Sequence, residues 1–184
     1  MNHLGTQVLE TPRLILRPFT VEDGPAMYRN WCGDPEVTRY LTWPAHTSEA
    51  VSTEIALFWA SQYAQPTFYQ WAMVLKSLGE PIGSISVVGR NEPIAAVEVG
   101  YCIGRPWWGQ GLTAEALSRL LPFFLEEVGA NRVEATHDLR NPNSGKVMAK
   151  CGMTFEGVRR QGARNNLGLC DAACYAILKE DWKP

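Results

Sequence analysis

A short glycine motif, Gly109-Gln110-Gly111, stands between a strand-like run and a helix-like run. Glycine lets a backbone adopt positive φ angles and approach another molecule closely. A strand, a tight glycine turn and a helix N-terminus can together bind phosphate through backbone amides. A plain turn that uses glycine only for its geometry is the alternative. The motif raises the hypothesis of a phosphate site.

Two named phosphate motifs do not fit this stretch. A Walker loop requires a Lys after its last glycine, and none follows Gly111. A dinucleotide fingerprint has its third glycine where this chain has Ala114. The runs before the motif also predict an antiparallel meander, which does not belong to a doubly wound sheet. The phosphate hypothesis therefore concerns another class of ligand.

The chain around this motif is typical of one globular domain, which we expect to span residues 1–184. It has 184 residues, 46% of them hydrophobic and 20% charged, which is enough to bury a core. The net charge of −2 gives no basic excess, so we expect no binding to nucleic acid. There is neither an apolar run of membrane-spanning length nor the layout of a signal peptide. These features predict a cytoplasmic protein without membrane contact.

The cysteines give no sign of a disulfide framework or a metal site. Their number is odd and no CxxC occurs, so we expect free thiols and no metal. The five are Cys32, Cys102, Cys151, Cys170 and Cys174.

Hydrophobic periodicity and turn residues predict the elements that position the glycine motif. The expected strands are 13–19, 69–75, 82–89, 96–104, 132–137, 154–160 and 170–178. The expected helices are 21–30, 48–62, 113–128 and 143–151. A further short helix is expected to start within 33–37. Because 96–104, 113–128 and 132–137 form a strand-helix-strand unit, two of these strands should be parallel. The order predicts an α+β fold with a mixed, mostly antiparallel sheet, flanking helices and a central βαβ unit.

Local signals add detail to these elements. Thr20 with Asp23 resembles a capping box, and Ser48 can cap the helix that follows it. We expect Val51, Ile55, Phe58 and Trp59 to share one buried face of that helix. Pro122 should kink the helix 113–128, which Gly129 can end. The polar run 161–168 is expected to be a loop.

Four sequence stretches in this order resemble the GNAT superfamily of acyl-CoA N-acyltransferases. They are ETPRLILRPFTVED (10–23), GEPIGSISV (79–87), VEVGYCIGRPWWGQGLTAEAL (97–117) and LRNPNSGKVMAKCGMTFEG (139–157). Within that superfamily the chain is most similar to the ribosomal-protein N-acetyltransferase branch (the RimJ/RimL type). The resemblance covers nearly the whole chain.

The resemblance implies that acetyl-CoA is the cosubstrate. The family loop [QR]xxGx[GA] places its first position at Pro106, so backbone amides should carry more of the pyrophosphate binding. Thr113 would cap the helix or donate to a phosphate, and the role of Arg105 stays open. The strand that ends near Ile103 would separate from its neighbour and pair with the pantetheine arm. The implied coenzyme-binding residues are Tyr101, Ile103, Trp108, Gly109, Gln110, Gly111, Leu112, Thr113 and Asn141.

Acetyl transfer to an amine requires a base, an oxyanion donor and a proton donor for the thiolate. Glu98, on the strand leading to the glycine motif, is the first candidate for the base; it is equally compatible with a solvent-facing or ion-paired carboxylate. A backbone amide of the same strand would be the oxyanion donor, by resemblance. The family's late-helix Tyr is replaced by Met148, and the resemblance implies Ser144 as the proton donor, with a helix-capping hydroxyl as the alternative. His137 is a reserve base.

The first two helices and the 161–168 run would form the acceptor groove, with Trp31, Tyr40 and Trp43 as candidate substrate contacts. Core packing is the alternative for these aromatic residues. A protein N-terminal amine is the expected acceptor; a small amine or an antibiotic is the alternative. Because Pro106 and Met148 depart from the wider pattern, a non-catalytic acetyl-CoA-binding module stays open. A monomer and a homodimer are both compatible with the sequence.

Overall fold

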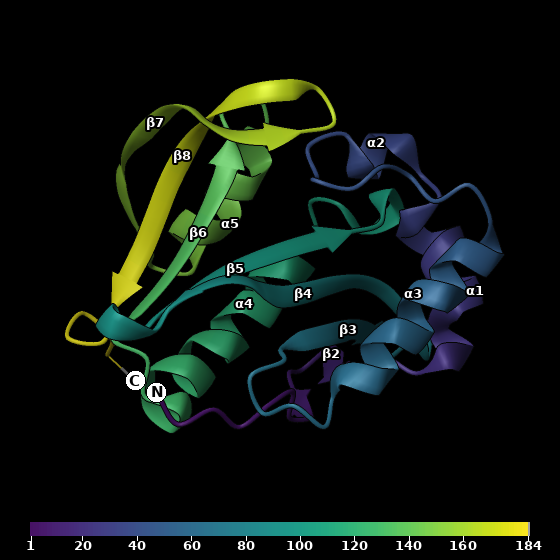
Figure 1. Cartoon of the computed structure of the whole chain (residues 1–184), viewed down its shortest axis with the longest axis horizontal. Coiled ribbons are helices and arrows are strands. Elements are labelled where there is room, and N and C mark those ends of the chain that lie inside the picture. Colours follow the sequence, from purple (N-terminus) through teal and green to yellow (C-terminus); the bar gives the residue numbers. More distant parts are fainter. Residues whose placement is uncertain (184) are drawn as a thin grey trace.

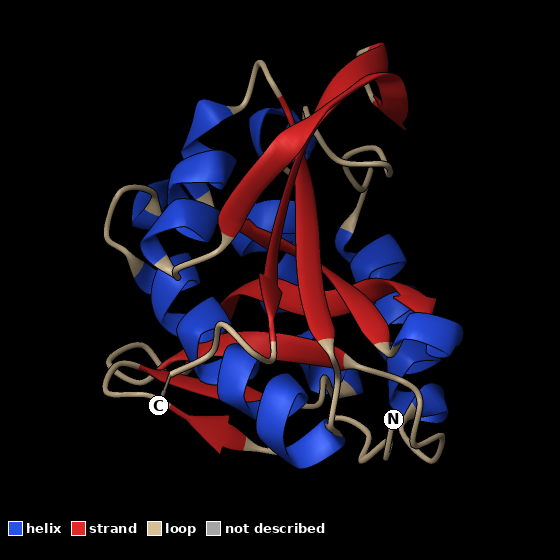
Figure 2. Ribbon diagram, turned by 90° about the vertical axis from the view of Figure 1, so that its left-hand side faces the viewer, coloured by secondary structure: helices blue, strands red, loops and turns tan. Residues whose placement is uncertain are grey.

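The computed structural model describes residues 1–183, which fold around one mixed sheet with helices on both sides (Figures 1 and 2). The strand order is β1-β2-β3-β4-β5-β6-β8-β7. Neighbouring strands are antiparallel except for β5 and β6, which are parallel as predicted. The strands are β1 Leu9–Glu10, β2 Leu14–Arg17, β3 Gln70–Leu75, β4 Glu80–Asn91, β5 Ala96–Ile103, β6 Arg132–Asp138, β7 Thr154–Asn165 and β8 Gly168–Leu178.

The helices follow the predicted order. They are α1 Gly24–Met27, α2 Pro35–Thr38, α3 Glu49–Gln62, α4 Leu112–Pro122 and α5 Pro142–Lys150. Short 3₁₀ and π turns flank them: η1 Val21–Asp23, η2 Tyr28–Cys32, η3 Glu92–Ile94, η4 Arg105–Trp107 and η5 Phe123–Val128. The Thr20–Asp23 capping box is present, and the Ser48 hydroxyl accepts from the Val51 amide. Both predicted caps are therefore confirmed.

The sheet separates two hydrophobic cores, because successive side chains of a strand point to opposite faces. Trp71 and Met73 of β3 pack with α4 in the larger core. Their neighbours Ala72 and Val74 pack against the α1 side in the smaller one. The cysteines of the described chain are free, as expected.

The face of α3 that packs inward differs from the prediction. Phe58 is 56% exposed, whereas Ser52 and Ala56 are fully buried. The cause is the close approach of α1: a Cβ on Gly24 would lie 2.2 Å from the Thr53 hydroxyl oxygen. Small side chains permit that contact and large ones would block it. Of the predicted face, Ile55 and Trp59 are partly buried against the smaller core, and only Phe58 turns to solvent.

Two other predicted segments change form. Most of 161–168 belongs to β7, which reaches Asn165 before a tight turn into β8. β7 is an edge strand and mostly exposed, so its polar composition is that of a solvated strand. The predicted kink at Pro122 takes the form of a switch from α-helix to the π turn η5, which ends at Gly129 with a φ of 76°.

Candidate functional site

The parallel strands β5 and β6 pair over only part of their length. Their register runs from Ala96 opposite Arg132 to Glu98 opposite Glu134. Beyond Glu98, β5 stays paired with β4 as far as Ile103, whereas β6 continues against β8. The strands therefore separate, which we call the β5–β6 opening (Figure 1). This confirms the predicted separation, and it leaves the β5 edge facing the opening without a partner strand among residues 1–183.

The glycine motif connects the end of this opening to the N-terminus of α4. Gly109 and Gly111 have φ angles of 74° and 75°, in the left-handed region that favours glycine. Gly111 is the N-cap of α4 and supplies no side chain, so the first amides of the helix have no capping side chain. Thr113 lies inside the first turn and is 8% exposed. Of the two predicted roles of Thr113, the helix cap is therefore wrong, and donation to a phosphate stays a prediction.

Two cations that sequence reasoning missed lie at this loop. The Arg13 guanidinium donates to the Gln110 carbonyl oxygen at 3.0 Å and pairs with Glu115 at 2.7 Å. Lys150, from the end of α5, places its Nζ 3.4 Å from where a Cβ on Gly111 would be. Both residues are remote from the motif in sequence, so only the tertiary fold brings them together.

The Arg13–Glu115 pair fixes the loop to β2 and α4. Burial opposes the charged form of Glu115, but hydrogen bonds from Thr11 and from the Arg13 amide and guanidinium outweigh it. The pKa of Glu115 is therefore lowered, and the carboxylate stays ionised. The Arg13–Glu115 ion pair therefore fixes the loop from outside, and the amides of the loop remain available as hydrogen-bond donors.

The side chains next to the motif have structural partners. The Trp108 indole, 49% exposed, donates to the Ile103 carbonyl oxygen at 2.8 Å. That carbonyl, predicted to pair with the pantetheine arm, is thus already engaged. Trp107 packs on the larger core, and Arg105 pairs with Asp34 at the N-cap of α2. Arg105 therefore links the loop to the first helices.

Glu98 lies at the point where β5 and β6 diverge. Its neighbours Val97 and Val99 point into the larger core, so Glu98 faces the other side of the sheet. Its Oε1 accepts from the Thr136 hydroxyl at 3.0 Å, which bridges the two strands. A Cβ on Gly89 would lie 3.1 Å from Oε2, so this glycine gives the carboxylate its space.

Ser144 lies on the opposite face of β5 from Glu98. Its hydroxyl donates to the Tyr101 hydroxyl at 3.1 Å, and Tyr101 donates to the Ser144 carbonyl oxygen at 2.9 Å. The N-cap of α5 is Asn141, so Ser144 does not cap the helix. Met148 is buried, with 1% of its surface exposed. The two candidate catalytic side chains thus approach the opening from two sides.

His137 is enclosed by packing. A Cβ on Gly145 would lie 2.5 Å from its Nε2, and its ring lies 5.8 Å from that of Tyr175. Its Nδ1 pairs with the Asp138 carbonyl oxygen at 2.8 Å. These contacts come from α5 and β8 and lie on the face of β6 away from Glu98, so we do not retain His137 as a base.

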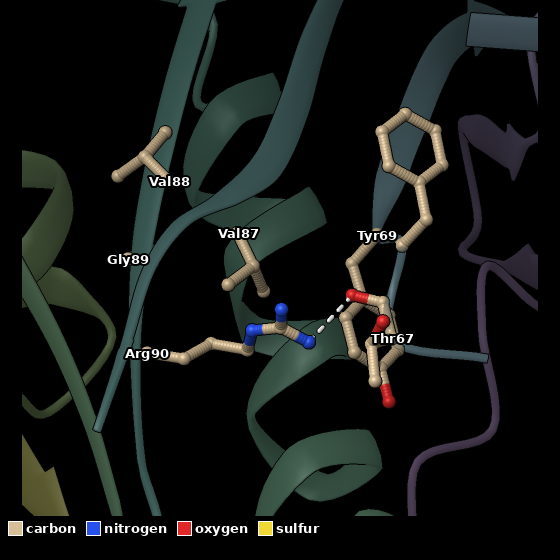
Figure 3. A pocket seen from close by; sticks show the side chains of 7 residues that line it. Thr67, Tyr69, Val87, Val88, Gly89 and Arg90 are labelled. Atoms are coloured by element: carbon tan, nitrogen blue, oxygen red, sulfur yellow. Dashed lines mark hydrogen bonds between the residues drawn. The ribbon is translucent and has the colours of Figure 1, made fainter. Parts of the chain in front are cut away.

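Two open pockets flank this region. One, of about 370 Å³, lies where β3 and β4 part; there Arg90 donates to the Thr67 carbonyl oxygen at 2.9 Å (Figure 3). Its wall includes Gly89, the register partner of Glu98. The other, of about 210 Å³, lies over β6, β8 and β7 and includes Thr136. Gly89 and Thr136, the neighbours of Glu98 on β4 and β6, thus each line a hollow, whereas Glu98 itself lines neither.

A family model described as "Acetyltransferase (GNAT) domain" matches residues 13–154. The chain belongs to the GNAT acetyltransferase family. It is accordingly an acetyl-CoA-dependent N-acetyltransferase. The match includes β5, the glycine motif, α4 and α5, which form the candidate site described above.

Relatives and solved structures agree with this family. The "Uncharacterized N-acetyltransferase YoaA" of Bacillus subtilis (strain 168) is 29% identical over 174 residues, 94% of this chain and 97% of that protein. The ribosomal-protein-serine acetyltransferase of Escherichia coli (strain K12) is 27% identical over 139 residues, 75% of this chain and 76% of that protein. The ribosomal L7/L12 α-N-protein acetyltransferase RimL, solved with coenzyme A, has the same fold. The match covers 96% of this chain and 100% of that one, at a TM-score of 0.83 and 18% identity.

Metal-ligand clusters and membrane-spanning helices are both absent from the described residues. Within 1–183 no group of His, Cys, Asp and Glu is arranged to hold a metal ion. No helix of that part of the chain is long and apolar enough to cross a membrane.

On the predicted acceptor side of this GNAT fold, hydrogen bonds of Asn166, which we call the Asn166 tie, join two distant segments. Asn166, at the tip of the β7–β8 hairpin, donates through its side chain to the carbonyl oxygens of Thr38 and Trp43, both at 2.8 Å. Its amide donates to the Leu41 carbonyl oxygen at 3.1 Å. The hairpin tip and the segment after α2 therefore lie side by side (Figure 1).

The three predicted acceptor contacts differ in accessibility. Tyr40 and Trp43 are half-buried beside the hairpin tip. Trp31 is 0% exposed and packs in the smaller core with Phe19 and Met27. The prediction that the Trp31 ring lines the groove is therefore corrected: its environment is the core, and core packing accounts for it.

A buried carboxylate also anchors the β7–β8 hairpin close to its tip. Asp138 accepts from Arg140 at 2.6 Å and from the Asn165 amide group at 2.7 Å. The Arg140 hydrogen bonds hold the pKa of Asp138 well below its usual range, against the effect of burial. Because the folded pKa is lower than the unfolded one, this stabilisation is present above the unfolded pKa and is lost as the pH falls.

Asp138→Asn should therefore destabilise the fold in a pH-dependent way. At pH 7 we expect a loss of about 2 kcal/mol in the free energy of unfolding, since a charge-assisted network is broken. Below about pH 4 the difference from wild type should shrink, because the unfolded carboxyl group then binds a proton that the folded one, with its lower pKa, does not. Urea denaturation at several pH values measures this. An equal difference at pH 7 and pH 3 would show that the charge of Asp138 contributes nothing.

Proposed function

We propose that this enzyme transfers the acetyl group of acetyl-CoA to the α-amino group of a protein N-terminus. The observation that carries the proposal is the position of Glu98, where β5 and β6 separate and on the strand that leads into the glycine loop. Named relatives that act on ribosomal proteins support the choice of acceptor. They include the ribosomal-protein-serine acetyltransferase and the uS5-alanine N-acetyltransferase of Escherichia coli (strain K12).

The coenzyme would lie along the β5–β6 opening with its pyrophosphate at the glycine loop. The amides of Gly109 to Thr113 would donate to the phosphate oxygens, with Lys150 nearby as a counter-charge. The unpaired edge of β5 would pair with the pantetheine arm as an added strand would. Asn141, at the start of α5, would contact the same arm. The thioester would then lie near the divergence of the two strands.

Glu98 would accept a proton from the acceptor amine, directly or through one water molecule. The neutral nitrogen forms a bond to the acetyl carbon, and a backbone amide of β5 donates to the carbonyl oxygen as it becomes negative. The C–S bond then breaks, and the Ser144 hydroxyl donates its proton to the departing sulfur while it takes up, through water, the second proton that the attacking nitrogen loses. The products are the acetylated amine and coenzyme A. No covalent enzyme intermediate is required.

The acceptor would enter on the Glu98 face of the sheet, past Tyr40 and Trp43. The Asn166 tie joins the hairpin tip directly to the segment after α2 and so bounds this entrance on one side. An entrance bounded in this way would suit an extended chain end better than the middle of a folded surface.

An acceptor screen tests the proposal. The protein is incubated with acetyl-CoA and matched peptides that have either a free or a blocked N-terminus, beside small amines and an aminoglycoside, and free thiol is followed. We expect thiol release only with free N-termini. Release only with the small amines would assign a small-molecule acceptor. Tight binding of acetyl-CoA without release by any acceptor would contradict enzymatic transfer.

Lys150→Gln should weaken the binding of acetyl-CoA by roughly five- to tenfold at low salt, because one cation near the phosphates is removed. The difference should shrink at high salt, since an exposed charge is screened. Titration calorimetry measures both. Lys179→Gln is the matched control: Lys179 is exposed beside Asn131, at the far end of α4 from Gly111. Equal effects of the two substitutions would remove Lys150 from the site.

A further inference from the structure

The Tyr101 side chain spans the space between β5 and α5. Its hydroxyl makes a reciprocal pair of hydrogen bonds with Ser144, to the carbonyl oxygen at 2.9 Å and from the hydroxyl at 3.1 Å. Tyr101 comes from the half of β5 that has already separated from β6. Apart from these bonds, it packs on the larger core. The contact therefore ties the open half of β5 to the first turn of α5.

Ser144 alone is a poorly fixed proton donor. A serine hydroxyl rotates freely about χ1, and in the first turn of a helix it can turn to solvent or to its own backbone. One turn later, the side chain on the same face of α5 is Met148, which has no proton to donate. The orientation of Ser144 must therefore be fixed by a group outside α5. The only hydrogen-bond partner of its hydroxyl among residues 1–183 is Tyr101.

We propose that Tyr101 is a positioning residue for the transfer reaction, which holds the Ser144 hydroxyl and the first turn of α5 against the β5–β6 opening. The inference rests on the proposed function, because it assigns Tyr101 a part in the step in which the sulfur leaves. In that step Ser144 turns its proton from the Tyr101 oxygen to the sulfur. The Tyr101 hydroxyl can in turn rotate from the Ser144 carbonyl to donate to the Ser144 oxygen.

The buried environment of Tyr101 keeps its hydroxyl group protonated, as the positioning role requires. Burial raises the pKa of its hydroxyl, and the hydrogen bond with Ser144 offsets only some of that shift. The phenol therefore stays protonated across the range in which such enzymes are assayed, and it remains a donor. Tyr101 orients Ser144 without itself giving up a proton.

Tyr101→Phe removes only the hydroxyl and tests the proposal. We expect kcat to fall about tenfold, which corresponds to the loss of one positioning hydrogen bond. The KM for acetyl-CoA should stay within about twofold, because the pyrophosphate contacts are unchanged. The double variant with Ser144→Ala should be no slower than Ser144→Ala alone, because the two hydroxyls act as one unit.

Tyr63→Phe is the matched control. The Tyr63 hydroxyl also makes two main-chain hydrogen bonds, with the Phe19 amide and the Gln70 carbonyl oxygen, but in the smaller core. It should lower the melting temperature without lowering kcat. A Tyr101→Phe enzyme with unchanged kcat, or losses that multiply in the double variant, would overturn the positioning role.

If the proposed function is wrong, the same experiments give a different result from a failure of the inference about Tyr101. In that case no acceptor releases thiol in the wild-type enzyme, and Ser144→Ala changes nothing. A wild-type enzyme that is active, together with an inactive Ser144→Ala and a fully active Tyr101→Phe, would leave the function standing and refute only the inference about Tyr101.

Discussion

Glu98→Gln is expected to lower kcat about a hundredfold while acetyl-CoA binding stays unchanged. A positioned general base contributes a factor of about 10² to 10⁴ in rate, and the amide of Gln cannot accept the proton of the attacking amine. Gln keeps the size of the side chain and can still accept from Thr136, which contacts Glu98 at 3.0 Å. Steady-state kinetics with an N-terminal peptide, beside calorimetry with acetyl-CoA, separates the two quantities.

Glu134→Gln is the control for this prediction. Glu134 is the register partner of Glu98 on β6 and has the same chemistry, but its carboxylate pairs with Arg132 at 2.7 Å. We expect its loss to leave kcat within about twofold of wild type. Equal rates for the two variants, whether both fast or both slow, would contradict the assignment of Glu98 as the base.

Gly111→Ala is expected to raise the Kd of acetyl-CoA at least about tenfold. A Cβ at a φ of 75° costs about 1–2 kcal/mol in this left-handed conformation, and the loop relieves it by turning its amides. The new methyl group would also lie 3.4 Å from the Lys150 Nζ, on the side where we place the phosphates. Calorimetry with acetyl-CoA measures the change, and circular dichroism confirms that the variant folds.

Gly129→Ala separates backbone strain from lost binding. Gly129 ends the helical segment that Gly111 begins, with a φ of 76° and no atom within 4 Å of the position that a Cβ would occupy. The strain should therefore be similar, and the fold should lose about 1 kcal/mol of stability. Acetyl-CoA should bind as it does to wild type. Weakened binding in Gly129→Ala to the same degree would mean that the glycine loop has no special part in the site.

The sequence predicts those features that depend on local signals. The order of elements, the two caps, the parallel pair β5–β6 and the positive φ angles of Gly109 and Gly111 all follow from residue types at short spacing. The exposed Phe58 was not predictable in this way, because the α1–α3 contact at Gly24 decides which face of α3 is buried. Polar composition likewise could not separate the edge strand β7 from a loop.

In the candidate site too, local sequence signals predict some features, and tertiary contacts determine the others. The sequence predicts Glu98 and Ser144 as candidates, but it does not predict that they lie on opposite faces of β5. Arg13 and Lys150 reach the glycine loop from β2 and α5, and no local pattern marks either residue. The bond between Tyr101 and Ser144 joins residues 43 positions apart. Contacts of this kind depend on how the sheet brings distant elements together.

The most direct test of the proposed function is to locate the acetyl group on the acceptor. A peptide with a free N-terminus and an internal lysine is incubated with the enzyme and acetyl-CoA, and tandem mass spectrometry then identifies the modified nitrogen. We predict one acetyl group, on the α-amino nitrogen, and none when Glu98→Gln replaces the wild-type enzyme over the same time. Acetylation of the lysine side chain alone, or none on any peptide while a small amine is acetylated, would contradict the account.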